Sequence, residues 1–417
     1  MRLSFADYNQ IAPTALKKEV KKLSLYREAV LQRVSDFDDT VSEYSLAYIA
    51  HPEVKDTLAF VKREFKSIKH LLLIGIGGSS LGVEAVHSVL DEGKVKLTVL
   101  DTIAANEIAT TLTEFLKYKK VSDIAVCVIS KSGSTTETQV NAAVVLDALK
   151  QKFGVSIYKQ TIFIGNQGTE LAKLGKKLGA HTIALPEIIG GRYSVGTAVG
   201  LIPLTLLRHD TEAFIEGFLA VHEEDIEKVV AESAARLSLL MQKKFSHYNF
   251  FAFEKRLAKL GAWYRQLFAE SIGKELDRNK KPVTKGFLPT ISTPVELHSI
   301  GQLYLAGFPG VYTDFVTFDD ETVDFKIPKQ GLGKQFSKFT AQEVTTAIYG
   351  GVVSAYHKEQ LPHRTTIFDD ELAYELGLFM AMRLRETMYV AELLNLNAFD
   401  QPNVELYKTY TKKILSL

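Results

Sequence analysis

Short apolar runs alternate with amphipathic segments along most of the chain. Between residues 69 and 185 the apolar runs predict strands, and the segments between them have the spacing of helices. The predicted strands are His70–Ile76, Lys96–Asp101, Asp123–Ser130, Thr161–Asn166 and Thr182–Leu185. Strands that are apolar throughout and alternate with helices are typical of a parallel sheet with both faces covered.

A second series of the same kind follows a polar helical stretch around Glu223–Glu227. Its predicted strands are Tyr248–Glu254, Gly310–Phe318 and Arg364–Phe368, and its predicted helices are Leu257–Ser271, Thr340–Glu359 and Glu371–Leu394. We therefore expect an α/β protein with two domains, each a parallel-stranded sheet sandwiched by helices.

The pattern also predicts the limits of these domains. Residues 1–45 form an N-terminal segment that is helical from residue 14, residues 46–215 the first domain, residues 216–395 the second, and residues 396–417 a C-terminal helical arm. The helix of the arm begins at about Pro402, and we expect it to pack back on the body.

Two of the predicted strands end in loops rich in glycine and hydroxyl side chains. Gly75–Ser80 has the sequence GIGGSS, and Ser130–Thr136, SKSGSTT, holds hydroxyls and one ammonium. Each loop precedes a predicted helix, whose free N–H groups and dipole favour an anion, and both lie at the carboxyl edge of one sheet. Ser134 and Glu137 have the spacing of a capping box. The loops predict a site for a phosphorylated small molecule.

Two other interpretations of the first loop stay open at this point. The glycines alone are compatible with a tight strand-to-helix turn. The second interpretation is a dinucleotide-binding site, because Asp101 ends the next strand, where such sites have an acid that binds the ribose. The G-x-G-x-x-G fingerprint of these sites is incomplete here, because Ser80 occupies the position of its third glycine. A dehydrogenase is therefore an alternative.

Charge and composition narrow the class of partner. With 50 basic and 49 acidic residues, the chain offers no electrostatic basis for binding nucleic acid or a membrane surface. The single cysteine, Cys127, lies in a predicted strand, which indicates a reducing compartment. The N-terminus has no apolar signal core and no segment has the length of a membrane span, so we expect a cytoplasmic protein. The histidines show no metal-binding spacing, so no metal or cofactor is expected.

Further motifs extend over about residues 70 to 410. In chain order they are Gly75–Gly82, Ser130–Thr138, Gly190–Pro203, AESIGKE around Glu270, ELHSIGQ around His298, and Asp400–Lys408. In these motifs and their order the chain resembles the glucose-6-phosphate isomerase family in its compact bacterial form. The resemblance implies two sugar-isomerase (SIS) domains and the metal-free interconversion of glucose 6-phosphate and fructose 6-phosphate through a cis-enediol.

The resemblance also implies roles for individual residues. Glu270 would shuttle a proton between two neighbouring carbons, and Arg192 would stabilise the enediolate. His298 and Lys408 would open the sugar ring, with His298 supplied by the neighbouring subunit of a homodimer. The remaining substrate and phosphate contacts are Gly78, Ser79, Ser130, Lys131, Ser132, Thr135 and Gln401.

One stretch departs from the family pattern, and two functional alternatives remain. Leu276–Lys285 is a charged loop that looks like a surface insertion between Glu270 and His298. A non-catalytic phosphosugar sensor would need the loops but not the four catalytic candidates. An isomerase that also accepts mannose 6-phosphate is possible, because discrimination at the second carbon depends on the shape of the pocket.

Overall fold

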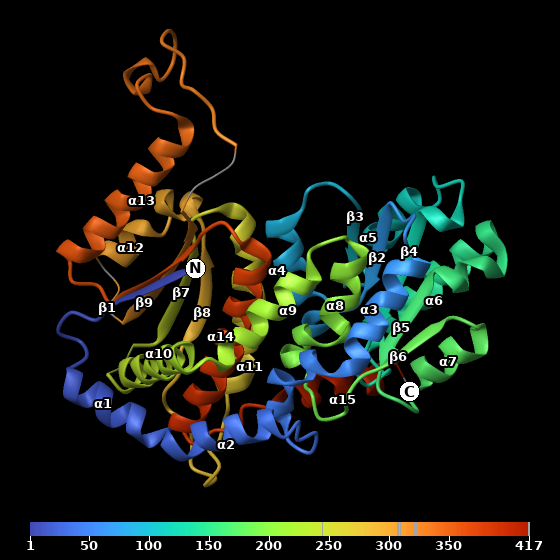
Figure 1. Cartoon of the computed structure of the whole chain (residues 1–417), viewed down its shortest axis with the longest axis horizontal. Coiled ribbons are helices and arrows are strands. Elements are labelled where there is room, and N and C mark those ends of the chain that lie inside the picture. Colours follow the sequence, from blue (N-terminus) through green and yellow to red (C-terminus); the bar gives the residue numbers. More distant parts are fainter. Residues whose placement is uncertain (244, 307, 309, 320–322, 416–417) are drawn as a thin grey trace.

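The computed structural model describes residues 1–243, 245–306, 308, 310–319 and 323–415. It contains two five-stranded sheets that lie side by side, each flanked by helices (Figure 1). The last two residues of the predicted C-terminal arm, 416–417, lie outside the described residues.

The first sheet is parallel throughout, with strand order β3-β2-β4-β5-β6. Its strands are β2 (His70–Ile74), β3 (Lys96–Leu100), β4 (Ile124–Ile129), β5 (Thr161–Gly165) and β6 (His181–Ala184). Alternate residues of β2 and β4 enter different apolar clusters: Leu71 and Cys127 share one with helices of one face, while Leu72 and Val126 share another with α6. The sheet is therefore covered on both faces, as predicted.

The second sheet has the order β1-β10-β9-β7-β8. Its parallel strands are β7 (His247–Ala252), β8 (Leu288–Ser292), β9 (Val311–Phe318) and β10 (His363–Phe368), and β1 (Arg2–Ala6) pairs antiparallel with β10. The sequence analysis missed β1 and β8. The N-terminal strand is held in place by the amino group of Met1, which lies 2.9 Å from the carboxylate of Asp369.

The helices follow the predicted order. They are α1 (Pro13–Lys22), α2 (Ser24–Ser35), α3 (Pro52–Glu64), α4 (Leu81–Leu90), α5 (Ala105–Phe115), α6 (Thr136–Phe153), α7 (Glu170–Leu178), α8 (Ala198–Leu206), α9 (Thr211–Leu219), α10 (Glu224–Gln242), α11 (Ala258–Ile272), α12 (Gly301–Ala306), α13 (Ala341–Lys358), α14 (Leu372–Leu393) and α15 (Glu405–Ile414). Short 3₁₀ turns used below are η3 (Gly77–Ser79), η6 (Gly191–Gly196), η9 (Pro294–His298) and η11 (Pro402–Val404).

Two features differ from the predicted organisation near the ends of domains. The helical segment expected from residue 14 to about 45 divides at Leu23 and its second helix ends at Ser35. The predicted boundary at 215 falls inside α9, which packs closely on α14: a Cβ on Gly217 would lie 1.8 Å from the carbonyl oxygen of Tyr374. The division of the chain into domains near residue 215 stays a prediction.

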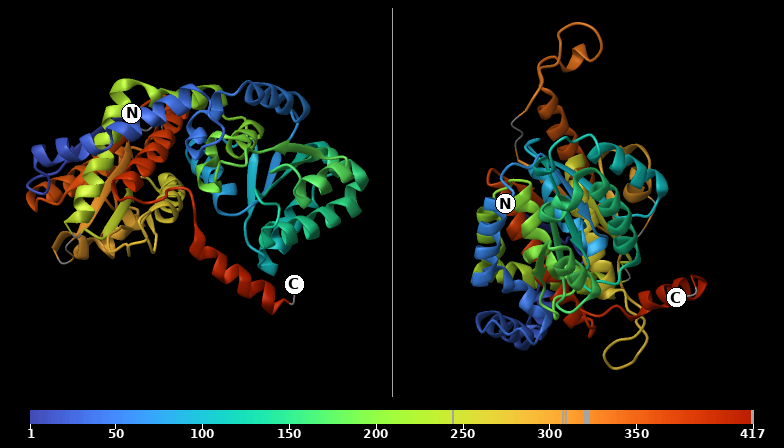
Figure 2. Two further views of the ribbon diagram at one scale, coloured as in Figure 1. Left: turned by 90° about the horizontal axis from the view of Figure 1, so that it is seen from below. Right: turned by 90° about the vertical axis from the view of Figure 1, so that its right-hand side faces the viewer.

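The prediction that the C-terminal arm packs back on the body is wrong. Helix α15 extends away from the rest of its own chain in both views of Figure 2, and it has no buried residue. Its large apolar side chains are exposed, with Leu406 at 65% and Ile414 at 82%. Among the described residues, none of the helices is both long and apolar enough to cross a membrane.

Candidate active site

The candidate site lies where the carboxyl edge of the first sheet meets α11 from the second half of the chain. The loop at the end of β2 contains η3, and η6 follows β6 in the chain. The two loops touch so closely that a Cβ on Gly78 would lie 2.3 Å from the backbone carbon of Gly191. Gly77 has φ +62°, which favours glycine, and faces the side chain of Gln266 on α11. Backbone contact thus brings the predicted phosphate loop against the segment that carries Arg192.

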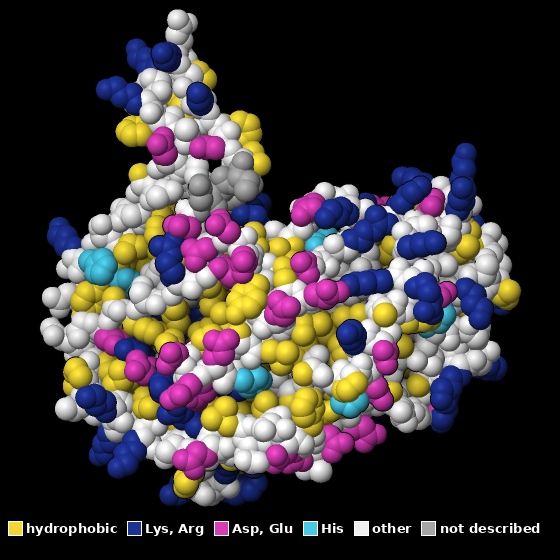
Figure 3. Space-filling view, viewed as in Figure 1, with side chains coloured by type: hydrophobic (Ala, Val, Ile, Leu, Met, Phe, Trp, Pro, Cys, Tyr) yellow, Lys and Arg dark blue, Asp and Glu magenta, His cyan; other side chains and the backbone are white. Residues whose placement is uncertain are grey.

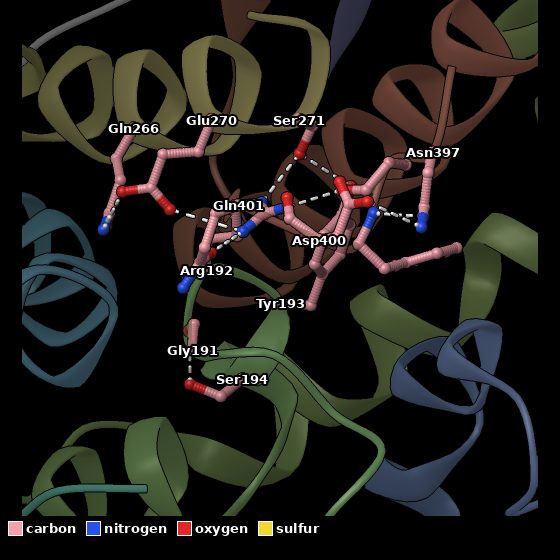
Figure 4. A network of polar contacts seen from close by, with 12 residues as sticks. Gly191, Arg192, Tyr193, Ser194, Gln266, Glu270, Ser271, Asn397, Asp400 and Gln401 are labelled. Atoms are coloured by element: carbon pink, nitrogen blue, oxygen red, sulfur yellow. Dashed lines mark hydrogen bonds and ion pairs between the residues drawn. The ribbon is translucent and has the colours of Figure 1, made fainter. Parts of the chain in front are cut away.

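Arg192 is the centre of the polar network in Figure 4. Its side chain is 1% exposed, and Nη1 lies 3.3 Å from Oε2 of Glu270 and also donates to Oε1 of Gln401. Nε donates to Oγ of Ser271 at 2.9 Å. Nη2 donates to the carbonyl oxygens of Ala398, at 2.6 Å, and Asp400, at 3.0 Å. A guanidinium has five N–H donors, so every donor of this buried cation has an acceptor.

Glu270 lies in the last turn of α11, and its side chain is 33% exposed. Oε1 accepts from Nε2 of Gln266, one turn earlier, at 3.1 Å, while Oε2 faces Arg192. The carboxylate is therefore held by a neutral amide on one side and a cation on the other. Oε1 of Gln266 is buried and has no hydrogen-bond partner among the described residues.

Lys274 closes the network at the end of α11. Its Nζ donates to the carbonyl oxygen of Glu270 at 2.8 Å, pairs with Oδ1 of Asp400 at 2.9 Å, and donates to the carbonyl oxygen of Asp400. Burial lowers the pKa of Lys274, and the hydrogen bond and charge of Asp400 oppose that shift. The sequence analysis assigned no role to this lysine.

The second loop forms a hydroxyl cluster at the start of α6. Oγ of Ser130 lies 3.0 Å from Oγ1 of Thr135, and Oγ of Ser132 accepts from the backbone N–H and the hydroxyl of Ser134. The predicted capping box is wrong, because Ser134 bonds to Ser132 and Thr135 occupies the N-cap position without a side-chain cap bond. The first N–H groups of this eighteen-residue helix are therefore not capped by that side chain.

A cation accompanies the hydroxyl cluster. Lys131 is half-buried between Ser130 and Ser132, burial lowers its pKa, and the charge of Arg192 acts in the same direction. Ser79, half-buried in η3, belongs to the neighbouring loop, because β2 and β4 are adjacent parallel strands. The two predicted phosphate loops therefore lie side by side at one edge of the sheet.

His298 and Lys408 lie apart from this network. His298 is exposed at the end of η9, and no hydrogen bond or ion pair involves its side chain within the described part of the chain. Lys408 is on the projecting helix α15, where Nζ pairs with Oε1 of Glu405 at 2.6 Å. Within a single chain Arg192 contacts Glu270 and Gln401, and among the described residues no hydrogen bond or ion pair joins either predicted ring-opening residue to these three.

The Leu276–Lys285 loop is an ordered turn at the surface. Leu276 and Pro282 form an antiparallel bridge, and the backbone N–H of Asp277 donates to the carbonyl of Lys281 at 2.8 Å. Side-chain contacts tie the turn to the end of α14, including Arg278 with Glu392. Together with residues 397–406 the turn borders a cavity of about 580 Å³ that reaches Lys274 and Asp400.

These groups match the requirements of moving a proton between adjacent carbons. A partly exposed carboxylate lies beside a buried guanidinium, next to hydroxyl-rich loops suited to a phosphate. A family model described as phosphoglucose isomerase matches residues 19–302. The chain belongs to the phosphoglucose isomerase family. It is an aldose–ketose isomerase that interconverts glucose 6-phosphate and fructose 6-phosphate, a reaction of glycolysis and gluconeogenesis.

Individual relatives agree with the family assignment. A glucose-6-phosphate isomerase of Clostridium tetani is 30% identical over 379 residues, which cover 85% of this chain and 82% of that protein. One from Thermus thermophilus is 29% identical over 387 residues, 89% of this chain and 90% of that protein. These matches confirm the predicted family and make a dehydrogenase or a sensor the weaker interpretation.

Solved structures share the fold. A hypothetical protein from Thermus thermophilus superposes with a TM-score of 0.84 at 25% identity and covers 100% of both chains. A glucose-6-phosphate isomerase from Chlamydia trachomatis superposes with a TM-score of 0.83 at 18% identity, over 99% of this chain and 88% of that one. The α/β fold with two parallel-stranded sheets is confirmed, apart from the antiparallel edge strand β1.

The sequence analysis missed Gln266, Ser271 and Lys274. Gln266 and Lys274 are spaced four residues to either side of Glu270, so helical periodicity was the available signal. Ser271 accepts from Arg192 and also lies 2.9 Å from the hydroxyl of Tyr193, contacts that no local pattern indicates.

Proposed function

We propose that Glu270 is the base that moves the proton during isomerisation. Its carboxylate would take the proton from carbon 2 of the open-chain aldose, and a cis-enediolate would form as the carbonyl electrons shift to oxygen 1. The same carboxyl would return the proton to carbon 1, while a hydroxyl proton passes from oxygen 2 to oxygen 1. The partial exposure of Glu270 and its position between Gln266 and Arg192 support this role.

Arg192 is proposed to stabilise the enediolate through its Nη1 edge. Nε and Nη2 donate to Ser271 and to backbone carbonyls, which hold the guanidinium plane. The acceptors at Nη1 are the side chains of Glu270 and Gln401, which can rotate. A substrate oxygen can therefore replace a side-chain acceptor at Nη1 while the other contacts of the cation stay in place. Gln401 is the proposed second contact to the sugar.

The phosphate is proposed to bind between the two loops of the first sheet. The proposed contacts are the hydroxyls of Ser79, Ser130, Ser132 and Thr135 and the backbone at Gly78 and Lys131. The support is their common edge, the pairing of Ser130 with Thr135, and the dipole of α6. Bound there, the phosphate would leave the sugar carbons to extend toward Glu270.

The metal-free character of the reaction is part of the proposal. Among the described residues, no group of three or more His, Cys, Asp or Glu side chains is arranged to hold a metal ion. Fructose 6-phosphate conversion, coupled to glucose-6-phosphate dehydrogenase, should therefore be unchanged by a chelator. Activity that disappears with chelator and returns with a divalent cation would refute the metal-free proposal.

We further propose a cytoplasmic location, in keeping with the single buried Cys127.

We propose that ring opening requires a homodimer, with His298 supplied by the partner and Lys408 by α15. His298 is exposed and has no side-chain hydrogen bond or ion pair among the described residues, and α15 exposes large apolar side chains such as Ile414. The segment 323–340 projects from the body as the column at the top of Figure 3 and also exposes large apolar groups, with Phe325 at 70% and Leu332 at 99%. Exposed apolar surface of this extent is typical of interfaces.

Mixed dimers test the contribution of His298 across the interface. Glu270→Gln and His298→Ala are each expected to be inactive as homodimers. If His298 acts in the partner's site, a dimer with one chain of each kind contains one site with both groups intact, so coexpression restores activity. If His298 acts within its own chain, every site of the mixed dimer carries a defect. Inactive mixed dimers would therefore refute the assignment.

A further inference from the structure

Lys274 joins the end of the base-carrying helix to the irregular segment 397–401. Its side chain is 5% exposed, and Nζ contacts the carbonyl oxygen of Glu270 together with the carboxylate and the carbonyl oxygen of Asp400. The ammonium has three N–H donors, and each has an acceptor here. One cation thus connects two segments that are separated by 126 residues in the sequence.

The segment held by Lys274 is also the segment that orients Arg192. The carbonyl oxygen of Asp400 accepts from Lys274 and from Nη2 of Arg192, so the two cations meet at one atom. Ala398 gives the second carbonyl to Nη2, and Gln401 accepts from Nη1. The segment 397–401 is neither helix nor strand, so side-chain contacts such as Asn397 with Asp400 set its path.

We propose that Lys274 is a positioning residue for the isomerase reaction: it fixes segment 397–401 against the end of α11 and so sets the Nη1 edge of Arg192 relative to Glu270. The inference rests on the proposed roles of Glu270 and Arg192. Lys274 itself points at the backbone and at Asp400 (Figure 4 shows the position of Asp400), not at the hydroxyl loops that would hold the phosphate.

Geometry and charge both call for a lysine at this position. The point charge of an ammonium can face three oxygens that lie in different directions, whereas a planar guanidinium donates in one plane. The carboxylate of Asp400 supplies the charge that keeps a cation stable at a site whose burial disfavours it. A shorter or apolar side chain would remove the hydrogen bond from residue 274 to the carbonyl oxygen of Asp400, so that Arg192 would be its remaining donor. Segment 397–401 could then move relative to the end of α11.

The effect should appear in kcat more than in KM. Arg192 would act on the charge that develops in the transition state, and a displacement of this kind can cost about 100-fold in rate. We expect Lys274→Met to lower kcat by roughly 10- to 100-fold with KM within about threefold of wild type. Lys274→Arg should recover part of the rate, because it keeps the charge. Asp400→Asn should cost less than Lys274→Met, because the backbone carbonyl remains.

The experiment measures kcat and KM for fructose 6-phosphate in these variants and in Lys285→Met, a control at an exposed lysine in the turn that follows Lys274. Thermal unfolding of each variant identifies any that fail to fold, in which case Lys274→Arg and Asp400→Asn carry the test. A kcat within about twofold of wild type in folded Lys274→Met, or a loss seen only in KM, would overturn the inference. Glu270→Gln and Arg192→Lys run in parallel: if these remain active, the proposed function fails instead.

Discussion

Replacing Glu270 by Gln tests the proposed base with the least disturbance of its surroundings. The glutamine has nearly the same shape, and its amide oxygen can keep the contact with Nη1 of Arg192. Its new NH₂ group would then face Gln266, whose own NH₂ now donates to Glu270. A flip of the Gln266 amide resolves that conflict, because its buried Oε1 has no partner among the described residues and can accept from the new NH₂.

The structure allows the effect of Glu270→Gln on the free energy of unfolding to be separated from its effect on the activation free energy. The carboxylate is 33% exposed and its ion pair with Arg192 is 3.3 Å long, so solvent screening limits the change in the free energy of unfolding to about 1 kcal/mol. Loss of a general base costs about 10²- to 10⁴-fold, which corresponds to roughly 2.7–5.5 kcal/mol in the activation free energy. The rate should therefore fall far more than the stability.

The assay couples product formation to glucose-6-phosphate dehydrogenase in the presence of a chelator, and calorimetry measures phosphosugar binding. Wild-type enzyme in deuterium oxide should also introduce deuterium into product, because the proton held by Glu270 can exchange with solvent. The variant should bind fructose 6-phosphate close to the wild-type affinity but yield neither product nor deuterated substrate. Glu275→Gln, at an exposed glutamate in the turn that follows, is the matched control.

An active Glu270→Gln enzyme would refute the assignment of the base. Deuterium exchange without product would also contradict it, since another group would then be removing the proton. Loss of binding together with loss of turnover would place Glu270 among the groups that bind substrate rather than those that transfer the proton.

Three further predictions follow from other contacts. Ser130→Ala combined with Thr135→Ala should raise KM by roughly 100-fold with a smaller change in kcat, since hydrogen bonds to a charged group contribute about 1.5–3 kcal/mol each; an unchanged KM would place the phosphate elsewhere. Gly78→Ala should lower the free energy of unfolding by about 1–3 kcal/mol, because the new Cβ would lie 2.3 Å from the backbone of Gly191. Gly191→Ala should cost less, because a Cβ at Gly191 meets open space. Equal melting temperatures of the two variants would contradict this prediction. Burial raises the pKa of Glu386, but the charges of Arg364 and Arg383 outweigh burial and bring that pKa to about 2, below the ordinary value of 4.5. The ionised carboxylate therefore stabilises the fold at neutral pH, and this contribution is lost as the pH falls from about 5 to 2. Glu386→Gln should flatten the stability profile in that range, as measured by urea unfolding, and an unaltered acid limb would exclude Glu386 as its source.

The local pattern of the sequence was enough to predict most of the fold. Runs such as Leu71–Ile74 and Ile124–Ile129 are apolar because both faces of a parallel strand are buried, so their type and order were visible without a structure. The loops proposed to bind phosphate could be recognised for the same reason, since a glycine- or serine-rich turn after such a strand is a local feature. Strand β1 was missed because its pairing with β10 depends on residues more than 350 positions away.

Contacts between distant segments decided the site. Arg192 meets Glu270 across 78 residues and Gln401 across 209, and the sequence indicated these partners only through family resemblance. Gln266 and Lys274 looked like ordinary polar residues around the end of a helix, and the prediction that α15 packs on its own body was wrong because an amphipathic helix does not specify which surface covers it. Most strands and helices, and the residue types in the loops, could therefore be predicted from the sequence, because they depend on neighbouring residues. Which donors face which acceptors depends on the tertiary structure, because a buried guanidinium takes its partners from the segments that the packing of the two sheets brings within hydrogen-bond distance.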